Sequence, residues 1–137
     1  MIRGLSHITL LCRDLDRMAA ILTGVLDARE VYSSGPESFS VAPEKFFLVG
    51  DVWLAVMEGE RAGGRSYEHI AFRVAAADLP GYRERIARMG LEERPTRPRV
   101  QGEGESIYFH DDDGHLFELH SGTLEARLAR YGQGRAA

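Results

Sequence analysis

The sequence predicts an α+β protein made of two βαβββ units, and the first sign of this is a pair of matching segments. His7-Ile8-Thr9-Leu10 and His69-Ile70-Ala71-Phe72 each open a short apolar run, and each run leads into a helical pattern with an acidic residue at its start. Strand-like runs follow the helical pattern in both halves. These features indicate an internal duplication that keeps a histidine in each half.

The chain has 137 residues and is 44% hydrophobic, which suits one compact domain or two fused half-units. A unit of about sixty residues buries little surface alone, so the halves should share a core or pair with a second chain. We predict a single domain over residues 1–137, with a first βαβββ unit at about 5–58, a second at about 67–122 and a C-terminal helix at about 123–131.

The first unit begins with an alternating strand over residues 5–12. Asp14 then provides the N-cap of a helix whose apolar residues recur at helical spacing. Strand-like runs follow at residues 31–33, 45–49 and 52–57, and the last two are joined by a tight turn at Gly50 and Asp51.

The second unit repeats this order, with a strand over residues 68–74 and a helix that Asp78 caps and Gly90 ends. Two further strands are expected at residues 106–110 and 115–120. A last helix begins near Thr123, and its inward-facing residues are expected to be Leu124, Leu128 and Tyr131. Residues 94–105 are rich in Arg, Pro and Gly and indicate an ordered functional loop whose arginines can bind an anion.

Charge and hydropathy exclude two classes of partner. The net charge is −4 and the estimated pI is 5.7, without the basic stripe that neutralises a phosphate backbone, so nucleic acid is not an expected partner. No apolar run approaches the roughly 20 residues that span a bilayer, and the first residues lack the sequence pattern of a signal peptide. We expect no membrane partner and a cytoplasmic location. Cys12 is the single cysteine and is expected to be a buried, reduced thiol.

Two histidines and one glutamate are the candidate metal ligands. His7 and His69 open the two repeats, and Glu118 lies in a strand-like run near the end of the second unit. Two imidazoles and a carboxylate form a facial set that leaves coordination positions open for a substrate. An isolated strand histidine is more often a structural residue, and His120, on the same strand face as Glu118, competes as a ligand on spacing alone.

Several sequence segments resemble those of a known family. The order of elements, the spacing of the three ligands and residues 108–118 (YFHDDDGHLFE) together resemble the vicinal oxygen chelate superfamily, which includes the glyoxalase and bleomycin resistance-like proteins. Residues 4–10, 67–72 and 102–109 look like fosfomycin resistance proteins. Residues 44–48 and 97–104 look like the FosX type, the epoxide hydrolases of that group.

The resemblance implies a curved mixed sheet with a metal cup between βαβββ units that pair across a homodimer. His7 of one chain would then join His69 and Glu118 of the other, with Mn²⁺ as the family metal, although such ligands also suit other divalent metals. Potassium activation, known in the thiol-transferring relatives, is not expected, because Gly102 stands where those enzymes have a serine.

The resemblance also implies the substrate, fosfomycin, and the residues around it. Arg127, Thr9, Ser106 and Tyr108 match positions that hold the phosphonate; Tyr67 and Trp53 match pocket positions more loosely and suit plain core packing equally well. Arg97 and Arg99 are alternatives for a further positive charge, with Arg97 as the choice. Glu44 is the candidate general base that takes a proton from water; otherwise it is a surface residue paired with Lys45.

The predicted activity is therefore a manganese-dependent hydrolase that adds water to the oxirane ring of fosfomycin and so confers antibiotic resistance. Two alternatives stay open from sequence. One is transfer of glutathione or another thiol to the same epoxide, and the other is a non-catalytic protein that sequesters a drug in the same cup.

Overall fold

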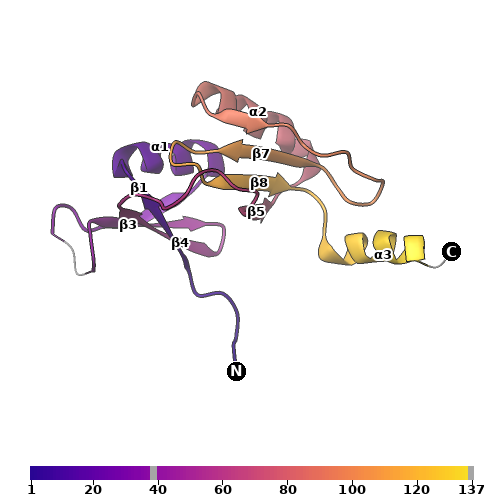
Figure 1. The fold of residues 1–137 in the computed structure, drawn as a ribbon, viewed down its shortest axis with the longest axis horizontal. Helices are drawn as coiled ribbons and strands as arrows, with labels where there is room; N and C mark the ends of the chain where they lie inside the picture. The colour runs from indigo at the N-terminus through magenta and orange to yellow at the C-terminus, as the bar shows by residue number, and fades with distance from the viewer. Residues whose placement is uncertain (38–39, 136–137) are drawn as a thin grey trace. The chain divides into compact units, whose positions relative to one another are not determined.

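The computed structural model describes residues 1–37 and 40–135. They form two compact units: residues 1–64 together with 111–113, and the rest of the described chain from residue 65. Each unit contains one four-stranded mixed sheet with a helix packed along it (Figure 1). In the described part of the chain, no helix combines the length and the apolar character that crossing a bilayer needs.

The first unit has the predicted order of elements. They are β1 (Ile8–Cys12), α1 (Leu15–Leu26), β2 (Arg29–Ser33), β3 (Glu44–Val49) and β4 (Val52–Glu58). The strand order in the sheet is β1-β4-β3-β2, with β1 parallel to β4 and the other pairs antiparallel. Asp14 caps α1, since its carboxylate accepts a hydrogen bond from the Arg17 N–H at 3.0 Å, and Gly50 has a φ of 58° in the β3–β4 turn.

The two faces of the first sheet differ in character. The face that carries Leu10, Phe47 and Leu54 is fully or nearly fully buried together with the apolar residues of α1. The strand registers place the other set of side chains on the opposite face. That set includes Thr9, Glu44, Phe46, Trp53 and Ala55. The turn residues Asp112 and Asp113 belong to this unit and are held by Arg17 and Arg13.

The second unit repeats the topology. Its elements are β5 (His69–Arg73), a 3-10 turn (Ala76–Asp78), α2 (Leu79–Arg88), β6 (Glu92–Arg94), β7 (Ser106–His110), β8 (Leu116–His120) and α3 (Leu124–Arg135). The strand order β5-β8-β7-β6, with β5 parallel to β8, matches that of the first unit. Phe109 and Phe117 are fully buried on the α2 side, and burying a side chain of this size stabilises a fold by about 1.5–3 kcal/mol.

The α+β fold class and the two βαβββ units are confirmed, with three local corrections. The strand β6 was not predicted, because Glu92, Glu93 and Arg94 show no apolar alternation. Asp78 occupies the cap position of α2 without a side-chain hydrogen bond. The inward orientation predicted for α3 is wrong for Leu124, Leu128 and Tyr131, which are 73%, 61% and 44% exposed, because α3 runs past the end of β8 and does not fold back on the sheet (Figure 1).

Candidate metal and anion site

The polar face of the second sheet brings His69 and Glu118 together. The register places His69 opposite Leu116 on β8, so Glu118 lies two residues along on the same face. The His69 Nε2 and Glu118 Oε1 atoms are 3.0 Å apart, and the Glu118 side chain is buried. Two atoms that bind one ion at about 2.1 Å and at right angles lie roughly 3 Å apart, so this pair fits adjacent coordination positions of a divalent metal.

The backbone fixes the ring of His69 in a form that can bind a metal. Its Nδ1 atom lies 2.6 Å from the carbonyl oxygen of Tyr67. Because a carbonyl can accept but not donate, Nδ1 carries a proton, and Nε2 is the ring nitrogen that faces Glu118 and is available to a metal. A hydrogen bond on the distal nitrogen of this kind is the usual support of a metal-binding histidine.

A chain of hydrogen bonds leads from Glu118 to α3. The Ser106 hydroxyl donates to Glu118 Oε2 at 2.5 Å and lies 2.7 Å from His120 Nδ1, while Arg127 donates to His120 Nε2 at 3.0 Å. With Arg127 on Nε2, the His120 proton belongs on Nδ1, where it is donated to Ser106. Burial and the neighbouring arginines keep the pKa of His120 below its usual value. Both ring nitrogens are therefore engaged within the protein.

Arg99 from the loop between β6 and β7 completes this cluster. Its Nη2 atom is 2.8 Å from the Tyr108 hydroxyl, 3.0 Å from Ser106 Oγ and 3.4 Å from Glu118 Oε2. The Tyr67 hydroxyl donates to that of Tyr108 at 3.2 Å, and burial raises the pKa of Tyr108. Arg99 thus brings a positive charge beside the carboxylate, and Arg127 brings a second one to the far side of His120.

Arg97, two residues away in the same loop, has a different partner. Its guanidinium donates to both carboxylate oxygens of Glu103, at 2.9 and 3.3 Å. The side chain of Glu103 is 2% exposed, and the guanidinium holds its pKa well below the usual range. The structure therefore brings Arg99, and not Arg97, to the cluster around Glu118.

The first unit carries the remaining predicted residues on the open face of its sheet. The ring of His7 lies 4.4 Å from that of Trp53, which in turn lies 5.1 Å from Phe46. Thr9 is exposed on this face, and Glu44 is 8% exposed at the start of β3. The buried indole N–H of Trp53 has no acceptor among the described residues. His7, Thr9, Trp53 and Glu44 thus share one face, away from α1.

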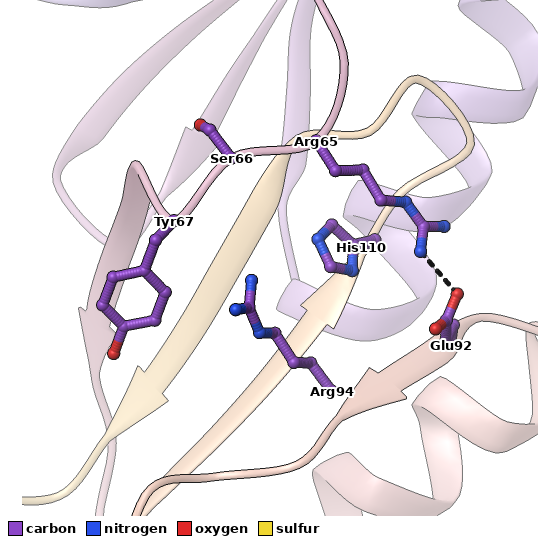
Figure 2. A pocket seen from close by; sticks show the side chains of 6 residues that line it. All are labelled: Arg65, Ser66, Tyr67, Glu92, Arg94 and His110. Carbon is purple, nitrogen blue, oxygen red and sulfur yellow. Dashed lines mark hydrogen bonds and ion pairs between the residues drawn. The ribbon is translucent and has the colours of Figure 1, made fainter.

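A cavity of about 470 Å³ lies on the polar face of the second sheet, and Figure 2 shows the side chains that line it. Arg65 and Glu92 form an ion pair of 2.7 Å at one side, and the Arg94 guanidinium lies 5.1 Å from the centre of the Tyr67 ring. Arg94 is also the cross-strand neighbour of Tyr108. Tyr67 therefore lines this cavity and, through Tyr108, contacts the cluster around Glu118.

No group of three His, Cys, Asp or Glu side chains that could hold a metal ion occurs within the described residues. His69 and Glu118 belong to the second unit, whereas His7 belongs to the first. Each unit thus presents part of the predicted ligand set.

Comparison with known proteins identifies the family. Residues 4–119 match the model of the glyoxalase/bleomycin resistance protein/dioxygenase superfamily. The chain is 60% identical over 137 residues to the fosfomycin resistance protein FosX of Mesorhizobium japonicum, covering 100% of this chain and 99% of that protein. The chain belongs to the FosX family of this superfamily. It is 53% identical to FosX of Listeria innocua, over 96% of this chain and 98% of that one.

Solved FosX structures share the fold. FosX from Mesorhizobium loti superposes with a TM-score of 0.84 at 58% identity, over 95% of this chain and 100% of that chain. A glutamate-to-glutamine mutant of FosX from Listeria monocytogenes, complexed with Mn(II) and 1S,2S-dihydroxypropylphosphonic acid, gives 0.87 at 53% identity, over 96% and 99%. The metallothiol transferase FosB of Shouchella clausii is more distant, at 36% identity over 96% of this chain and 88% of that protein.

Two polar residues of this region were not predicted from sequence. Glu103 was passed over, although a single acid between two glycines in an arginine-rich loop is a usable signal of a buried ion pair. Arg94 was included only in the general statement about loop arginines. His120, the competing ligand candidate on spacing alone, has its two ring nitrogens in contact with Ser106 and Arg127.

Proposed function

We propose that this protein is a manganese-dependent hydrolase that adds water to the oxirane ring of fosfomycin and releases a vicinal diol phosphonate. The observation that carries the proposal is the His69–Glu118 pair, oriented for a divalent ion and with the Arg99 guanidinium beside the carboxylate. Identity of 60% to a FosX protein over the full chain supports the same assignment. Ring opening removes the strained epoxide, so the product can no longer alkylate a nucleophile.

The metal site is completed across a homodimer in this proposal. His69 and Glu118 of one chain are joined by His7 from the second chain. The registers support this division: in the first sheet Ala55 holds the position that Glu118 has in the second, so the first unit offers an imidazole without an adjacent carboxylate. When bound, Mn²⁺ supplies a Lewis acid for the oxirane oxygen and the phosphonate.

The phosphonate, with about two negative charges, is held by Arg99, Arg127, Ser106 and Tyr108, with Thr9 from the first unit. Arg99 is preferred to Arg97 because the Arg99 Nη2 atom already lies among these groups, whereas the charge of Arg97 is balanced by its ion pair with Glu103. Guanidinium groups suit this task because they form short, charge-assisted hydrogen bonds to phosphonate oxygens. Tyr67 and Trp53 form apolar walls of the pocket.

Glu44 acts as the general base. It accepts a proton from water as the water oxygen bonds to an oxirane carbon and the carbon–oxygen bond of the ring breaks. The ring oxygen, released as an alkoxide, takes up a proton from solvent to complete the diol, and Glu44 returns its proton to solvent. The reaction therefore needs no co-reactant besides water. The position of Glu44 supports this role, because it is buried beside Phe46 on the face that also carries His7 and Thr9.

Phosphorus NMR of fosfomycin with purified protein and Mn²⁺ tests the function. We expect diol phosphonate to accumulate without any thiol, and chelation should stop the reaction. The similarity to a metallothiol transferase makes thiol transfer the second candidate. A product that formed only with glutathione or bacillithiol would establish that candidate, and fosfomycin bound unchanged after chelation would establish sequestration.

The protein is further proposed to work in the cytoplasm, without a nucleic-acid or membrane partner. The net charge of −4 supports the absence of a nucleic-acid partner, because a nucleic-acid site requires clustered positive charge.

A further inference from the structure

The two proposed phosphonate-binding arginines lie on segments that are far apart in sequence. Arg99 belongs to the loop of residues 95–105 between β6 and β7, whereas Arg127 belongs to α3. A binding site with two arginines is strong only if both are held at the right separation, because disorder in either one adds an entropic cost to binding. The structure contains a connection between these two segments.

That connection is the carboxylate of Glu103. It accepts hydrogen bonds from the Arg97 guanidinium, from the Val100 N–H at 2.8 Å and from the Tyr131 hydroxyl. Arg97 and Val100 flank Arg99 in the loop, and Tyr131 lies one helical turn beyond Arg127 on α3. A single buried side chain therefore joins both segments.

Two backbone contacts lie beside this carboxylate. Gly104 packs directly against Gly122: a Cβ atom on Gly104, where φ is 84°, would lie 2.5 Å from the Gly122 nitrogen. The Ser121 N–H donates to the Glu105 carbonyl oxygen at 3.0 Å. These contacts fix the end of the loop against the start of α3, so Glu103 is held by a rigid backbone.

We propose that Glu103 is a positioning residue for substrate binding, which sets the separation of Arg99 and Arg127 without touching substrate or metal. The inference rests on the proposed function, since it assigns these arginines to the phosphonate. In the described structure the carboxylate of Glu103 contacts neither His69 nor Glu118. Its loss should therefore weaken binding of the anion and leave the metal in place.

The test compares Glu103→Gln and Tyr131→Phe with the matched control Glu105→Gln, an exposed carboxylate in the same loop. Glutamine keeps the size of the side chain but removes the charge that binds Arg97. We expect the KM for fosfomycin to rise about tenfold in Glu103→Gln and about threefold in Tyr131→Phe, with kcat changed less than threefold, because uniform binding is lost. Mn²⁺ affinity, measured by electron paramagnetic resonance, and the Glu105→Gln kinetics should match the wild type.

A KM within twofold of wild type in both Glu103→Gln and Tyr131→Phe would overturn the proposal, as would equal losses of Mn²⁺ affinity and activity. Should Glu103→Gln fail to fold, Tyr131→Phe, which removes one hydroxyl, decides the question.

Titration with methylphosphonate, which has no epoxide, separates this inference from the proposed function. Tenfold weaker binding by Glu103→Gln, in a protein that does not open fosfomycin, would retain the role of Glu103 and reject the hydrolase.

Discussion

The two units of this molecule share one sheet topology but carry different chemistry on equivalent positions. His69 pairs with Leu116 in the second sheet, and the register of the first sheet, extended by one residue beyond β1, places His7 level with Trp53, whose ring is 4.4 Å away. Two residues further along the central strand, the first unit has Ala55 and the second has Glu118. On the neighbouring strand, Glu44 in the first unit corresponds to Ser106 in the second, since they pair with Met57 and His120 respectively.

This difference explains how a duplicated scaffold can serve one reaction. The second unit holds the two proposed metal ligands, His69 and Glu118, and most of the proposed anion-binding groups in one hydrogen-bonded cluster. The first unit offers a single imidazole together with a buried carboxylate, Glu44, that forms no part of that cluster. We infer that the second unit binds metal and phosphonate, whereas the first supplies the third ligand and the proton acceptor.

Removing a metal ligand should have the largest effect on metal binding and activity. The effect should be the same whether the ligand lies in the first unit or in the second. Glu118→Ala and His7→Ala are each expected to lose bound Mn²⁺ and to reduce diol formation at least about a thousandfold, because the Lewis acid contributes several kcal/mol. Metal analysis and phosphorus NMR measure both. If His7→Ala kept full metal content and activity, the first unit would have no place in the site.

Removing the base should separate chemistry from metal binding. Glu44→Gly is expected to lower kcat by about 10²–10⁴, the usual contribution of a general base, with Mn²⁺ affinity retained. The control is Glu30→Gln, which alters an exposed carboxylate paired with Lys45 in the same sheet. Normal turnover in the Glu44 variant would show that the first unit does not supply the base.

Substituting each of the two loop arginines should show which of them binds the phosphonate in the second unit. Arg99→Met should raise the KM for fosfomycin about 10- to 100-fold, since a charge-assisted hydrogen bond contributes about 1.5–3 kcal/mol. Arg97→Met, which acts through Glu103, should have a smaller effect, and Arg88→Met on the exposed face of α2 should have none. A larger effect for Arg97 than for Arg99 would reverse this assignment.

The smallest expected effect concerns the stability of the second unit at acid pH. The pKa of Glu103 lies well below its ordinary value because Arg97 and Tyr131 bind the carboxylate. The unfolded chain therefore takes up this proton first, so the stabilisation is present above the ordinary glutamate pKa and is lost as pH falls below it. Urea unfolding from pH 6 to pH 3 should show a shallower loss in Glu103→Gln than in wild type. Identical slopes would contradict the assignment.

Local sequence signals were sufficient for most of the fold. Asp14, Gly50 and Gly90 mark a helix cap, a hairpin turn and a helix end through their own side-chain or backbone chemistry, and the structure has each of them. The strand β6 was missed because its three residues are polar. The orientation of α3 was wrong because helical periodicity reports which residues share a face, but not whether a partner covers that face.

The candidate site was predictable in composition but not in contacts. Residue types and the segments that resemble the family singled out His69, Glu118 and Ser106. Only the register of β5, β7 and β8 shows that these side chains lie close together. Arg97 and Arg99 are identical side chains two residues apart, so the choice between them depends on loop geometry. The ion pair of the buried Glu103 carboxylate with Arg97 fixes that geometry, and neither partner belongs to a periodic pattern.

The central claim is that each metal site takes His7 from one chain and His69 with Glu118 from another, and complementation tests it most directly. His7→Ala and Glu118→Ala chains carrying different tags are mixed, and the heterodimer is purified. One of its two sites then has all three ligands, so we predict about half of the wild-type activity and metal content per dimer, although each parent variant is inactive. A heterodimer as inactive as its parents would show that the ligands come together within one chain and would contradict the account.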